Sequence, residues 1–346
     1  MKDDSLSFGL SGCGWFGGVH VDRLSRIPNV RIAAVTDPDV DAAKRLAEKV
    51  PAAARPEDGV AVYTDYADML RHPGLDAVSI NSPNRWHVEQ LIAALSAGRH
   101  VLCEKPLTLI PAEATAAIEA TRLSGKIVAI SYQSRYRREA RLLRHAVRSG
   151  RFGKVTSLSA VAGEDWVTPN LGTWRHDPER CPGGYFGDAN SHQLDLLLRI
   201  TGLSPVPGTV RATMEHRGTP VPIVIYGEAK LSGERSGETA SEVPFVFSFV
   251  GDSHRWRQEL TIITEGADFV LRDGDLLWSD AQSKPLAPFT EADAGLTHAL
   301  TTETPDDAFV AALRGGPPVD SAPETVLPVL NLTLAALAAA GEPLPR

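Results

Sequence analysis

Cysteine is scarce in this chain, which holds only 3 among its 346 residues. Cys13, Cys103 and Cys181 are far apart and form no C-x-x-C pair, which excludes a cysteine-based zinc cluster and argues against a disulfide framework. No apolar run approaches the ~20 residues that span a bilayer, so we expect no membrane partner. The polar N-terminus and the early glycines also do not fit a secretory signal. The sequence therefore predicts a cytoplasmic protein.

Basic charge is in deficit as well. The chain has 35 lysines and arginines against 43 aspartates and glutamates, a formal net charge of -8. The densest basic run, residues 135–144, has the spacing of one solvated helix face. Binding to DNA or RNA normally needs a clustered basic surface, so we expect no nucleic-acid partner. The length and the 43% of hydrophobic residues are those of a folded protein of two domains.

The first third of the chain alternates short apolar strands with helices. We expect strands at 6–11, 30–36, 77–81, 100–103 and 127–131, and helices at 20–26, 39–50, 66–71, 86–97 and 111–124. Such alternation is typical of crossover units, which build a parallel sheet with helices on both faces. Residues 1–131 are therefore predicted to form an α/β domain, a doubly wound Rossmann sheet that binds NAD(P).

The pattern changes from residue 132 onward. We expect strands at 154–161, 210–216, 221–231, 243–250, 257–264, 269–272 and 276–279, and helices at 138–149, 190–201, 306–313 and 323–340, with a long loop over 163–187. Consecutive strands with tight turns favour an antiparallel sheet. Residues 132–346 are thus predicted to be an α+β domain for substrate binding and oligomerisation, with helices on one sheet face. A second subunit is expected to cover the other face, in a homodimer or homotetramer, and the terminal helices could pack back on the first domain.

A glycine turn follows the first predicted strand. Residues 12–17 read GCGWFG, which fits the G-x-G-x-x-G pattern of dinucleotide-binding folds. Gly12 permits the tight turn, Gly14 lets the backbone approach a pyrophosphate, and Gly17 lets helix and strand pack closely. The helix that begins here presents free N–H groups to the phosphates. The predicted cofactor contacts in this turn are Gly12, Gly14, Trp15, Phe16 and Gly17.

An acidic residue at the end of the second predicted strand favours NAD over NADP. Asp37 lies 20 residues after Gly17, where its carboxylate can accept hydrogen bonds from both ribose hydroxyls and would repel a 2′-phosphate. Pro38 and Asp39 follow it, with no arginine to hold such a phosphate. The alternative is that Asp37 or Asp39 only caps the next helix, and we favour capping for Asp39.

Two further segments lie at the carboxyl edge of the predicted sheet, where open α/β folds bind ligands. Residues 81–87 read NSPNRWH and residues 103–106 read CEKP. The predicted cofactor-binding residues at this edge are Ser82, Pro83, Asn84, His87, Glu104 and Lys105. Cys103 could act as a nucleophile, but a cysteine at the end of a buried strand is more often inert.

These motifs together resemble the Gfo/Idh/MocA family (glucose–fructose oxidoreductase and inositol dehydrogenase-like). The resemblance rests on the glycine turn followed by His20, the S-P-N-x-x-H segment and the E-K-P motif. Downstream, Trp174-Arg175, Gly183-Gly184 and residues 188–195, DANSHQLD, are similar to the family's W-R, G-G-G and D-x-G-x-H-x-x-D stretches. Residues 309–321 resemble its late helix and Gly-Pro turn. The resemblance covers nearly the whole chain.

The resemblance implies a catalytic trio of Lys105, Asp188 and His192. Lys105 matches the lysine that touches nicotinamide and substrate in the family. The chemistry agrees, since alcohol oxidation needs a base at the oxygen and an imidazole has an ordinary pKa of ~6.5. A lysine cation favours developing alkoxide character, and an aspartate before the helix can orient the imidazole or bind a substrate hydroxyl. We therefore expect His192 to be the base, with Lys105 assisting.

The substrate side is less sharply defined. Trp174, Arg175 and Arg135 are further substrate-binding candidates beside the trio, although Trp166 and Trp174 could equally be core and Arg135 could form a surface salt bridge. Asp188, His192 and Asp195 have the i, i+4, i+7 spacing of metal ligands, but no other ligand cluster supports them and we expect no metal. The family's usual glycines are replaced by Tyr185 and Asn190, which could reshape the pocket.

The resemblance implies hydride transfer between NAD and a secondary alcohol of a sugar, inositol or sugar derivative. Three alternatives stay open: NAD-dependent redox-assisted hydrolysis of glycosides, a non-enzymatic dinucleotide-binding sensor or regulator, and reduction of an imine or biliverdin-type substrate. The retained trio favours alcohol chemistry.

Overall fold

The computed structural model describes residues 5–233, 241–280 and 285–345, and it divides the chain into two compact units. Unit 1 comprises residues 1–132 and 304–325, and unit 2 comprises residues 133–303 and 326–346. The first boundary lies one residue beyond the predicted one, and a late segment returns to unit 1. None of the described helices combines the length and the apolar composition that a membrane span needs.

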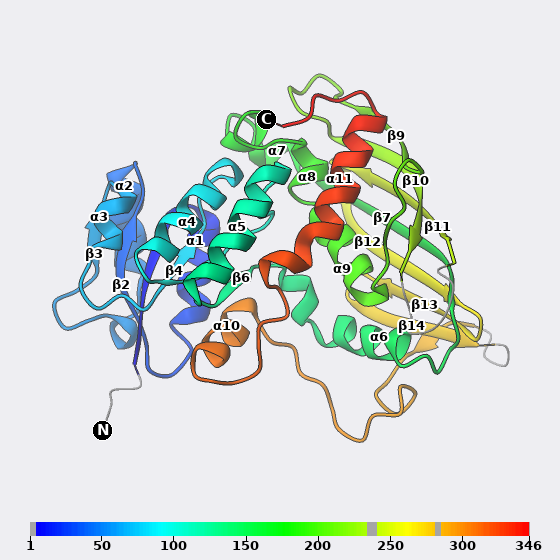
Figure 1. Ribbon diagram of the computed structural model, residues 1–346, viewed down its shortest axis with the longest axis horizontal. Coiled ribbons are helices and arrows are strands. Elements are labelled where there is room, and N and C mark those ends of the chain that lie inside the picture. The colour runs from blue at the N-terminus through cyan, green and yellow to red at the C-terminus, as the bar shows by residue number, and fades with distance from the viewer. Residues whose placement is uncertain (1–4, 234–240, 281–284, 346) are drawn as a thin grey trace. The chain divides into compact units, whose positions relative to one another are not determined.

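Unit 1 is built on a six-stranded parallel sheet in the order β3-β2-β1-β4-β5-β6 (Figure 1). The strands are β1 (Leu6–Ser11), β2 (Val30–Thr36), β3 (Ala61–Tyr63), β4 (Ala77–Ile80), β5 (His100–Cys103) and β6 (Val128–Ile130). The order reverses between β1 and β4, which is the topological switch point where doubly wound sheets bind ligands. The sequence missed only β3 among these strands, because three half-buried residues give too short a pattern.

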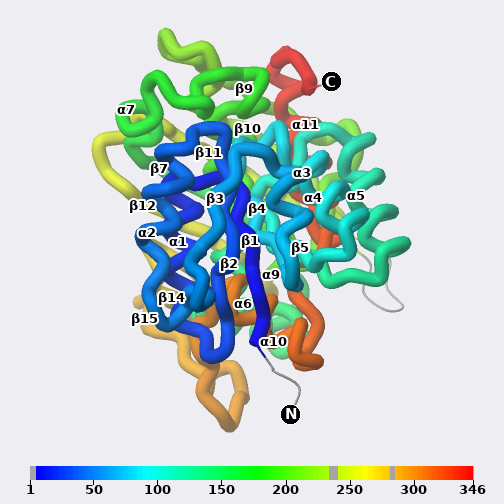
Figure 2. The backbone as a smooth tube through the Cα atoms, turned by 90° about the vertical axis from the view of Figure 1, so that its left-hand side faces the viewer, coloured from blue at the N-terminus to red at the C-terminus, as the bar shows by residue number. Residues whose placement is uncertain are grey.

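Helices cover both faces of this sheet, because right-handed crossovers on the two sides of the β1/β4 switch point place their helices on opposite faces. They are α1 (Trp15–Leu24), α2 (Val40–Lys49), α3 (Tyr66–Leu70), α4 (His87–Ser96), α5 (Pro111–Ser124) and α10 (Pro305–Leu313), with 3-10 turns η1 (Ala52–Ala54) and η2 (Asn84–Trp86). Figure 2 shows α1 and α2 on one side of the strands and α3, α4 and α5 on the other. The first helix begins at Trp15, five residues before the predicted start, because the glycine turn leads directly into it.

Residues from the late segment complete the core of unit 1. Phe309 and Val310 of α10 belong to the same buried cluster as Phe8 and Leu10 of β1. The rings of Phe8 and Phe309 meet edge to face with centroids 6.1 Å apart. The backbone of β6 also donates a hydrogen bond to this segment, from Ile130 N to Ser321 O at 2.8 Å. Unit 1 is therefore discontinuous in sequence.

Unit 2 is built on a nine-stranded sheet in the order β15-β14-β13-β12-β7-β11-β10-β8, with β9 also paired to β10. The strands are β7 (Val155–Asp165), β8 (Ser204–Pro205), β9 (Arg211–Glu215), β10 (Val224–Ser232), β11 (Val243–Val250), β12 (Asp252–Thr264), β13 (Ala267–Arg272), β14 (Asp275–Asp280) and β15 (Ala287–Pro288). The pairs are antiparallel except β7 with β11, which is parallel. The sheet is thus mainly antiparallel, as predicted.

Helices pack on one face of the unit 2 sheet (Figure 1). They are α6 (Arg138–Arg148), α9 (Ser191–Thr201) and α11 (Leu327–Ala339), and the shorter helices of unit 2 are η3 (Gln133–Tyr136), α7 (Val167–Asn170), η4 (Trp174–His176) and α8 (Gly184–Gly187). The 3-10 turn η5 (Pro323–Val326) lies at the unit boundary, with residues 323–325 in unit 1. Along β11, alternate residues such as Phe245 and Phe247 are buried, whereas Val246 between them is 52% exposed. A second subunit on this outer face stays a prediction.

Two predicted stretches differ in detail from the structure. The helix expected over 323–340 is a 3-10 turn followed by α11, whose first turn contains Pro328, a residue with no N–H to donate. The loop expected over 163–187 holds the end of β7 and the short helices α7, η4 and α8. The glycines and prolines of this segment predict a loop, and the short helices have too few residues to give a helical pattern.

Candidate active site

The glycine turn has the backbone geometry that its sequence predicts. Gly12 has a φ of +86°, and a Cβ added to it would lie 2.5 Å from the backbone of Asn81. A Cβ on Gly17 would lie 2.4 Å from the carbonyl oxygen of Gly12, so α1 packs directly on the turn. Gly14 caps α1, and nothing lies within 4 Å of an added Cβ there. The free N–H groups at the start of α1 are therefore open to a phosphate group, and the turn fits a dinucleotide.

Two aromatic residues follow Gly14 in this turn. Trp15 is 78% exposed, and its ring meets Phe16 edge to face at 4.8 Å. An exposed indole beside the turn is available to a bound ligand. The predicted cofactor contacts of Trp15 and Phe16 stay predictions.

Asp37 joins the end of β2 to the glycine turn. Its Oδ2 accepts a hydrogen bond from Cys13 N at 2.8 Å, and its Oδ1 accepts one from Asp39 N at 2.9 Å. Burial, followed by the charges of Asp37 and Asp39, raises the pKa of the Cys13 thiol to about 12. The N-cap of α2 is Asp39, whose carboxylate accepts from Asp41 N and Ala42 N. Capping is thus the role of Asp39 and not of Asp37.

Replacing Asp37 with serine is expected to weaken NADH binding about 10-fold or more, since a carboxylate that accepts hydrogen bonds contributes roughly 1.5–3 kcal/mol for each. NADPH binding should weaken less, because the repulsion of a 2′-phosphate is removed. Fluorescence titration with both cofactors measures the ratio of dissociation constants. Asp39→Ser is the matched control, which should change stability little, because serine caps a helix about as well as aspartate, and should leave the ratio unchanged. An unchanged ratio in Asp37→Ser would contradict the role of this carboxylate.

The segment after β4 is held against β1 by a glutamine that the sequence did not single out. Gln90 of α4 accepts hydrogen bonds on Oε1 from Ser11 Oγ at 3.0 Å and from Ser82 Oγ at 2.9 Å. Pro83 precedes the 3-10 turn η2, in which Asn84 is buried. A glutamine on an amphipathic helix looks solvated in a sequence, so no signal pointed to this role.

His87 connects the two segments at the carboxyl edge of the sheet. Its side chain is fully buried, with Nδ1 at 2.7 Å from Pro106 O and Nε2 at 2.9 Å from Ser82 O. Burial lowers the pKa of His87 below its ordinary value despite these two carbonyl groups. A neutral imidazole carries one N–H, so His87 can donate to only one of these two carbonyl oxygens at a time. With no exposed surface, it can act on a cofactor only through the segments of Ser82 and Pro106.

His87→Gln should therefore lower the free energy of unfolding by about 1–2 kcal/mol, because at least one buried carbonyl loses its donor. The NADH dissociation constant should rise in parallel, since both loops lose their common anchor. Urea denaturation and fluorescence titration measure the two effects. His145→Gln, on the exposed face of α6, is the control and should change neither. Unaltered NADH binding in a destabilised His87→Gln protein would limit His87 to a structural role.

Lys105 follows β5 in a tightly held segment. Lys105 and Glu104 are each only 6% exposed, and the Lys105–Pro106 peptide bond is cis. Glu104 Oε2 accepts a hydrogen bond from Lys105 N at 3.2 Å. The neighbouring Cys103 is fully buried, and burial raises the pKa of its thiol well above the ordinary value. This opposes the nucleophile alternative for Cys103.

In unit 2, three predicted residues come together. The Arg175 Nε donates to Asp188 Oδ2 at 2.8 Å, and the Arg175 guanidinium lies 4.4 Å from the ring centroid of Trp174. Asp188 is 2% exposed, whereas Arg175 and Trp174 are half-buried. Asp188 lies between α8 and α9, and His192 is the second residue of α9. The carboxylate is thus paired with a guanidinium, which the sequence spacing did not reveal.

Arg135 is buried rather than on the surface. Its Nε and Nη2 donate to Asp195 Oδ2 at 2.8 Å and Oδ1 at 2.5 Å, which fixes η3 to α9. The salt bridge considered for Arg135 is therefore real but lies in the interior. Asp195 is committed to this pair, and among the described residues no group of three or more His, Cys, Asp or Glu side chains could hold a metal ion.

The two departures from the family pattern are in contact. Asn190 Nδ2 donates to Tyr185 O at 3.1 Å, and both residues are buried. Tyr185 packs on Gly251, where an added Cβ would lie 2.8 Å from its ring. Trp166 is 5% exposed, and its ring centroid lies 5.4 Å from that of His176 and 5.6 Å from that of Tyr185. The core interpretation is therefore right for Trp166.

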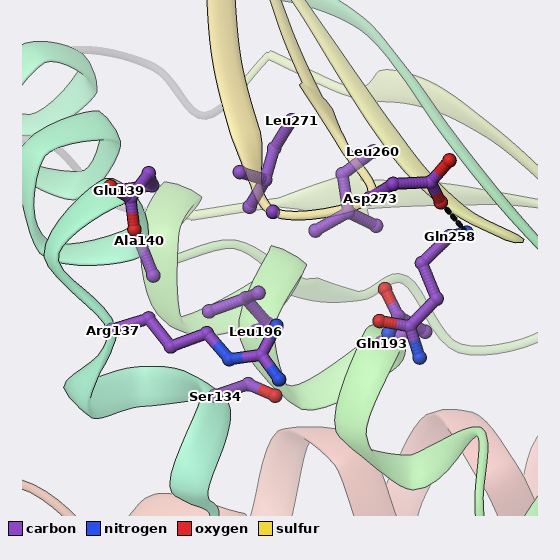
Figure 3. A pocket seen from close by; sticks show the side chains of 11 residues that line it. Ser134, Arg137, Glu139, Ala140, Gln193, Leu196, Gln258, Leu260, Leu271 and Asp273 are labelled. Carbon is purple, nitrogen blue, oxygen red and sulfur yellow. Dashed lines mark hydrogen bonds between the residues drawn. The ribbon is translucent and has the colours of Figure 1, made fainter. Parts of the chain in front are cut away.

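Unit 2 also contains a pocket that none of the predicted site residues lines (Figure 3). It lies between α6, α9 and the sheet, beside the hairpin that joins β13 to β14. Its lining residues are Ser134, Arg137, Glu139, Ala140, Gln193, Leu196, Gln258, Leu260, Leu271, Asp273 and Gly274. This pocket is therefore separate from the predicted site residues.

A 3-2-1-4-5-6 parallel sheet, a glycine turn at β1 and an acidic residue at the end of β2 define the class of NAD-binding Rossmann proteins. Residues 6–132 match the family described as "Oxidoreductase family, NAD-binding Rossmann fold", and residues 140–249 match "GFO/IDH/MocA C-terminal domain". The chain belongs to the Gfo/Idh/MocA family of oxidoreductases, which confirms the resemblance seen in the sequence.

Relatives share the fold and differ in their named substrates. Inositol 2-dehydrogenase of Corynebacterium glutamicum is 27% identical over 92% of this chain and 97% of its own length. D-glucoside 3-dehydrogenase of Escherichia coli is 29% identical over 66% of this chain and 63% of its own length. The chain spans about half to two thirds of several such curated relatives. The WlbA dehydrogenase of Bordetella pertussis, solved with NADH and UDP-GlcNAcA, has a TM-score of 0.80 at 21% identity, covering 100% of this chain and 99% of that one.

Proposed function

We propose that this protein transfers a hydride between NAD and a secondary alcohol of a sugar, inositol or sugar derivative. The observation that carries the proposal is that two features occur together. The glycine turn of residues 12–17 has the backbone geometry that a dinucleotide needs, and Lys105, Asp188 and His192 match the catalytic positions of the family. The named activities of the inositol and glucoside dehydrogenases support the substrate class.

The proposed mechanism divides the work among the chain's own side chains. His192 takes the hydroxyl proton as the carbon–hydrogen bond is broken, because an imidazole is a competent base near neutral pH. Lys105 stabilises the oxygen as it gains alkoxide character. Asp188 holds Arg175 through its 2.8 Å hydrogen bond, so the pair presents a guanidinium rather than a free carboxylate to this region of unit 2. NAD would supply the hydride acceptor, and the glycine turn of residues 12–17 together with Asp37 would hold it.

Arg175 and Trp174 suit a polyhydroxylated substrate. A guanidinium stacked on an indole offers donors to hydroxyl or carboxylate oxygens beside an apolar ring that can lie against a sugar face. Asp188 fixes the direction of those donors, since a charge-assisted hydrogen bond resists rotation of the side chain. We infer that Trp174, Arg175 and Asp188 contribute to substrate orientation.

The proposal is tested by following NADH absorbance with the purified protein against a panel of sugars, inositols and sugar acids. NAD and NADP are supplied in parallel. Turnover with NAD supports the proposal and names the substrate. Tight NAD binding with glycoside hydrolysis but no net NADH would overturn it in favour of redox-assisted hydrolysis, and binding with no turnover at all would favour a sensor.

A further inference from the structure

A buried histidine in unit 1 lies between two carboxylates. His20 of α1 is fully buried, with Nδ1 at 2.7 Å from Asp306 Oδ1 and Nε2 at 3.2 Å from Glu104 Oε1. Glu104 belongs to the E-K-P motif after β5, and Asp306 lies in the first turn of α10. Three segments that are far apart in the sequence therefore meet at one imidazole.

The geometry defines the charge state of this cluster. An ionised carboxylate only accepts hydrogen bonds, so two carboxylates facing both ring nitrogens require an N–H on each. Only the imidazolium form of His20 supplies both. Arg23 Nη1 lies 3.5 Å from Asp306 Oδ2 and adds a further positive charge. The buried charges are thus paired, as burial demands.

The cluster continues to the backbone of Lys105. Glu104 uses Oε1 toward His20 and Oε2 toward Lys105 N at 3.2 Å. On the other side of Lys105, the carbonyl of Pro106 is bonded by His87. The backbone of Lys105 is therefore anchored before and after by buried histidines. Displacement of a catalytic group by about 1 Å can cost about 100-fold in rate.

We propose that His20 is a positioning residue of Lys105, acting through Glu104 and anchored by Asp306 from the returning α10. The proposal rests on the function proposed above, because it assigns the effect to the lysine of that reaction. α10 packs against α1, so the late segment of the chain supports the lysine as well as the core.

The first test compares His20→Gln and Asp306→Asn with the control Asp307→Asn. Asp307 forms the capping box of α10 with Thr304. The carboxylates that contact His20 are those of Asp306 and Glu104. At saturating NAD, the two cluster variants should lower kcat about 10- to 100-fold with the KM for the alcohol changed less than about threefold. Asp307→Asn should lower the melting temperature but leave kcat unchanged. Melting temperatures that fall in all three with kcat unchanged would overturn the proposal.

The second test separates positioning from general stability. In a Lys105→Ala background, His20→Gln should lower the residual kcat no further, because effects that act through one group are not additive. A full additional loss would show that His20 acts independently of Lys105 and would overturn the proposal.

A substrate-free measurement keeps the two proposals distinct. If the wild-type protein turns over no alcohol, the proposed function fails, and NADH titration alone decides on His20. Weaker NADH binding by about 10-fold in His20→Gln and Asp306→Asn, but not in Asp307→Asn, supports positioning of the Lys105 segment. Equal dissociation constants in all four proteins would overturn it.

Discussion

Replacing His192 with alanine is expected to lower kcat for alcohol oxidation about 10²- to 10⁴-fold, the usual contribution of a general base. The dissociation constant of NADH should stay within about threefold of the wild type, because the imidazole acts on the hydroxyl proton rather than on the cofactor. Steady-state kinetics with the substrate found in the panel and fluorescence titration with NADH measure the two quantities.

Lys105→Ala should produce a loss of similar size, and the double variant should be little worse than the poorer single variant, since groups acting as a unit are not additive. His145→Ala on the exposed face of α6 is the control for loss of a histidine elsewhere in unit 2. A His192→Ala enzyme that keeps most of its kcat would show that another group is the base.

The free energy of unfolding is expected to fall by up to about 3 kcal/mol as the pH rises from 6.5 to above 9. Burial lowers the pKa of His20, but the charge and hydrogen bond of Asp306, followed by Glu104, raise it by more, to about 9. A group whose pKa is raised on folding stabilises the protein below its unfolded pKa and loses that contribution as the pH passes the folded value. Arg23 and Lys105 are the other charged groups of the cluster.

At acid pH, Glu104 makes the free energy of unfolding change with pH in the opposite direction. Burial raises the pKa of Glu104, whereas His20 and then Lys105 lower it by more, to about 2. The contribution of Glu104 is therefore present above its unfolded pKa and lost as the pH falls toward 2. Urea denaturation across this range measures both limbs. His20→Gln should flatten the alkaline limb, and an unchanged slope in that variant would assign the titration to another group.

Local patterns in the sequence were sufficient to predict most of the parallel sheet of unit 1, but not the return of residues 304–325 to this unit. Apolar strands such as residues 30–36 and the GCGWFG turn carry their geometry in adjacent residues, so the doubly wound sheet and its switch point were predictable. Capping by Asp39 was likewise a local property. β3 was missed because its three residues carry too little pattern.

Contacts between distant residues were not predictable in the same way. Nothing in the spacing of His20 and Asp306 indicates a pair separated by 286 positions. The parallel pairing of β7 with β11 depends on the path of the intervening chain, not on either strand. The resemblance supplied Asp188 and His192, but the guanidinium of Arg175 on Asp188 required the three-dimensional structure.

The discontinuity of unit 1 has a consequence for biosynthesis. A ribosome releases residues 1–132 first and residues 304–325 only after the middle of the chain. At ~5–20 residues per second, this delay lasts roughly 10 to 30 s. During that interval the nascent unit 1 lacks Phe309 for its core and Asp306 as the partner of His20. Unit 1 can therefore complete its fold only after most of unit 2 has been translated. Vectorial folding from the N-terminus alone cannot finish this domain.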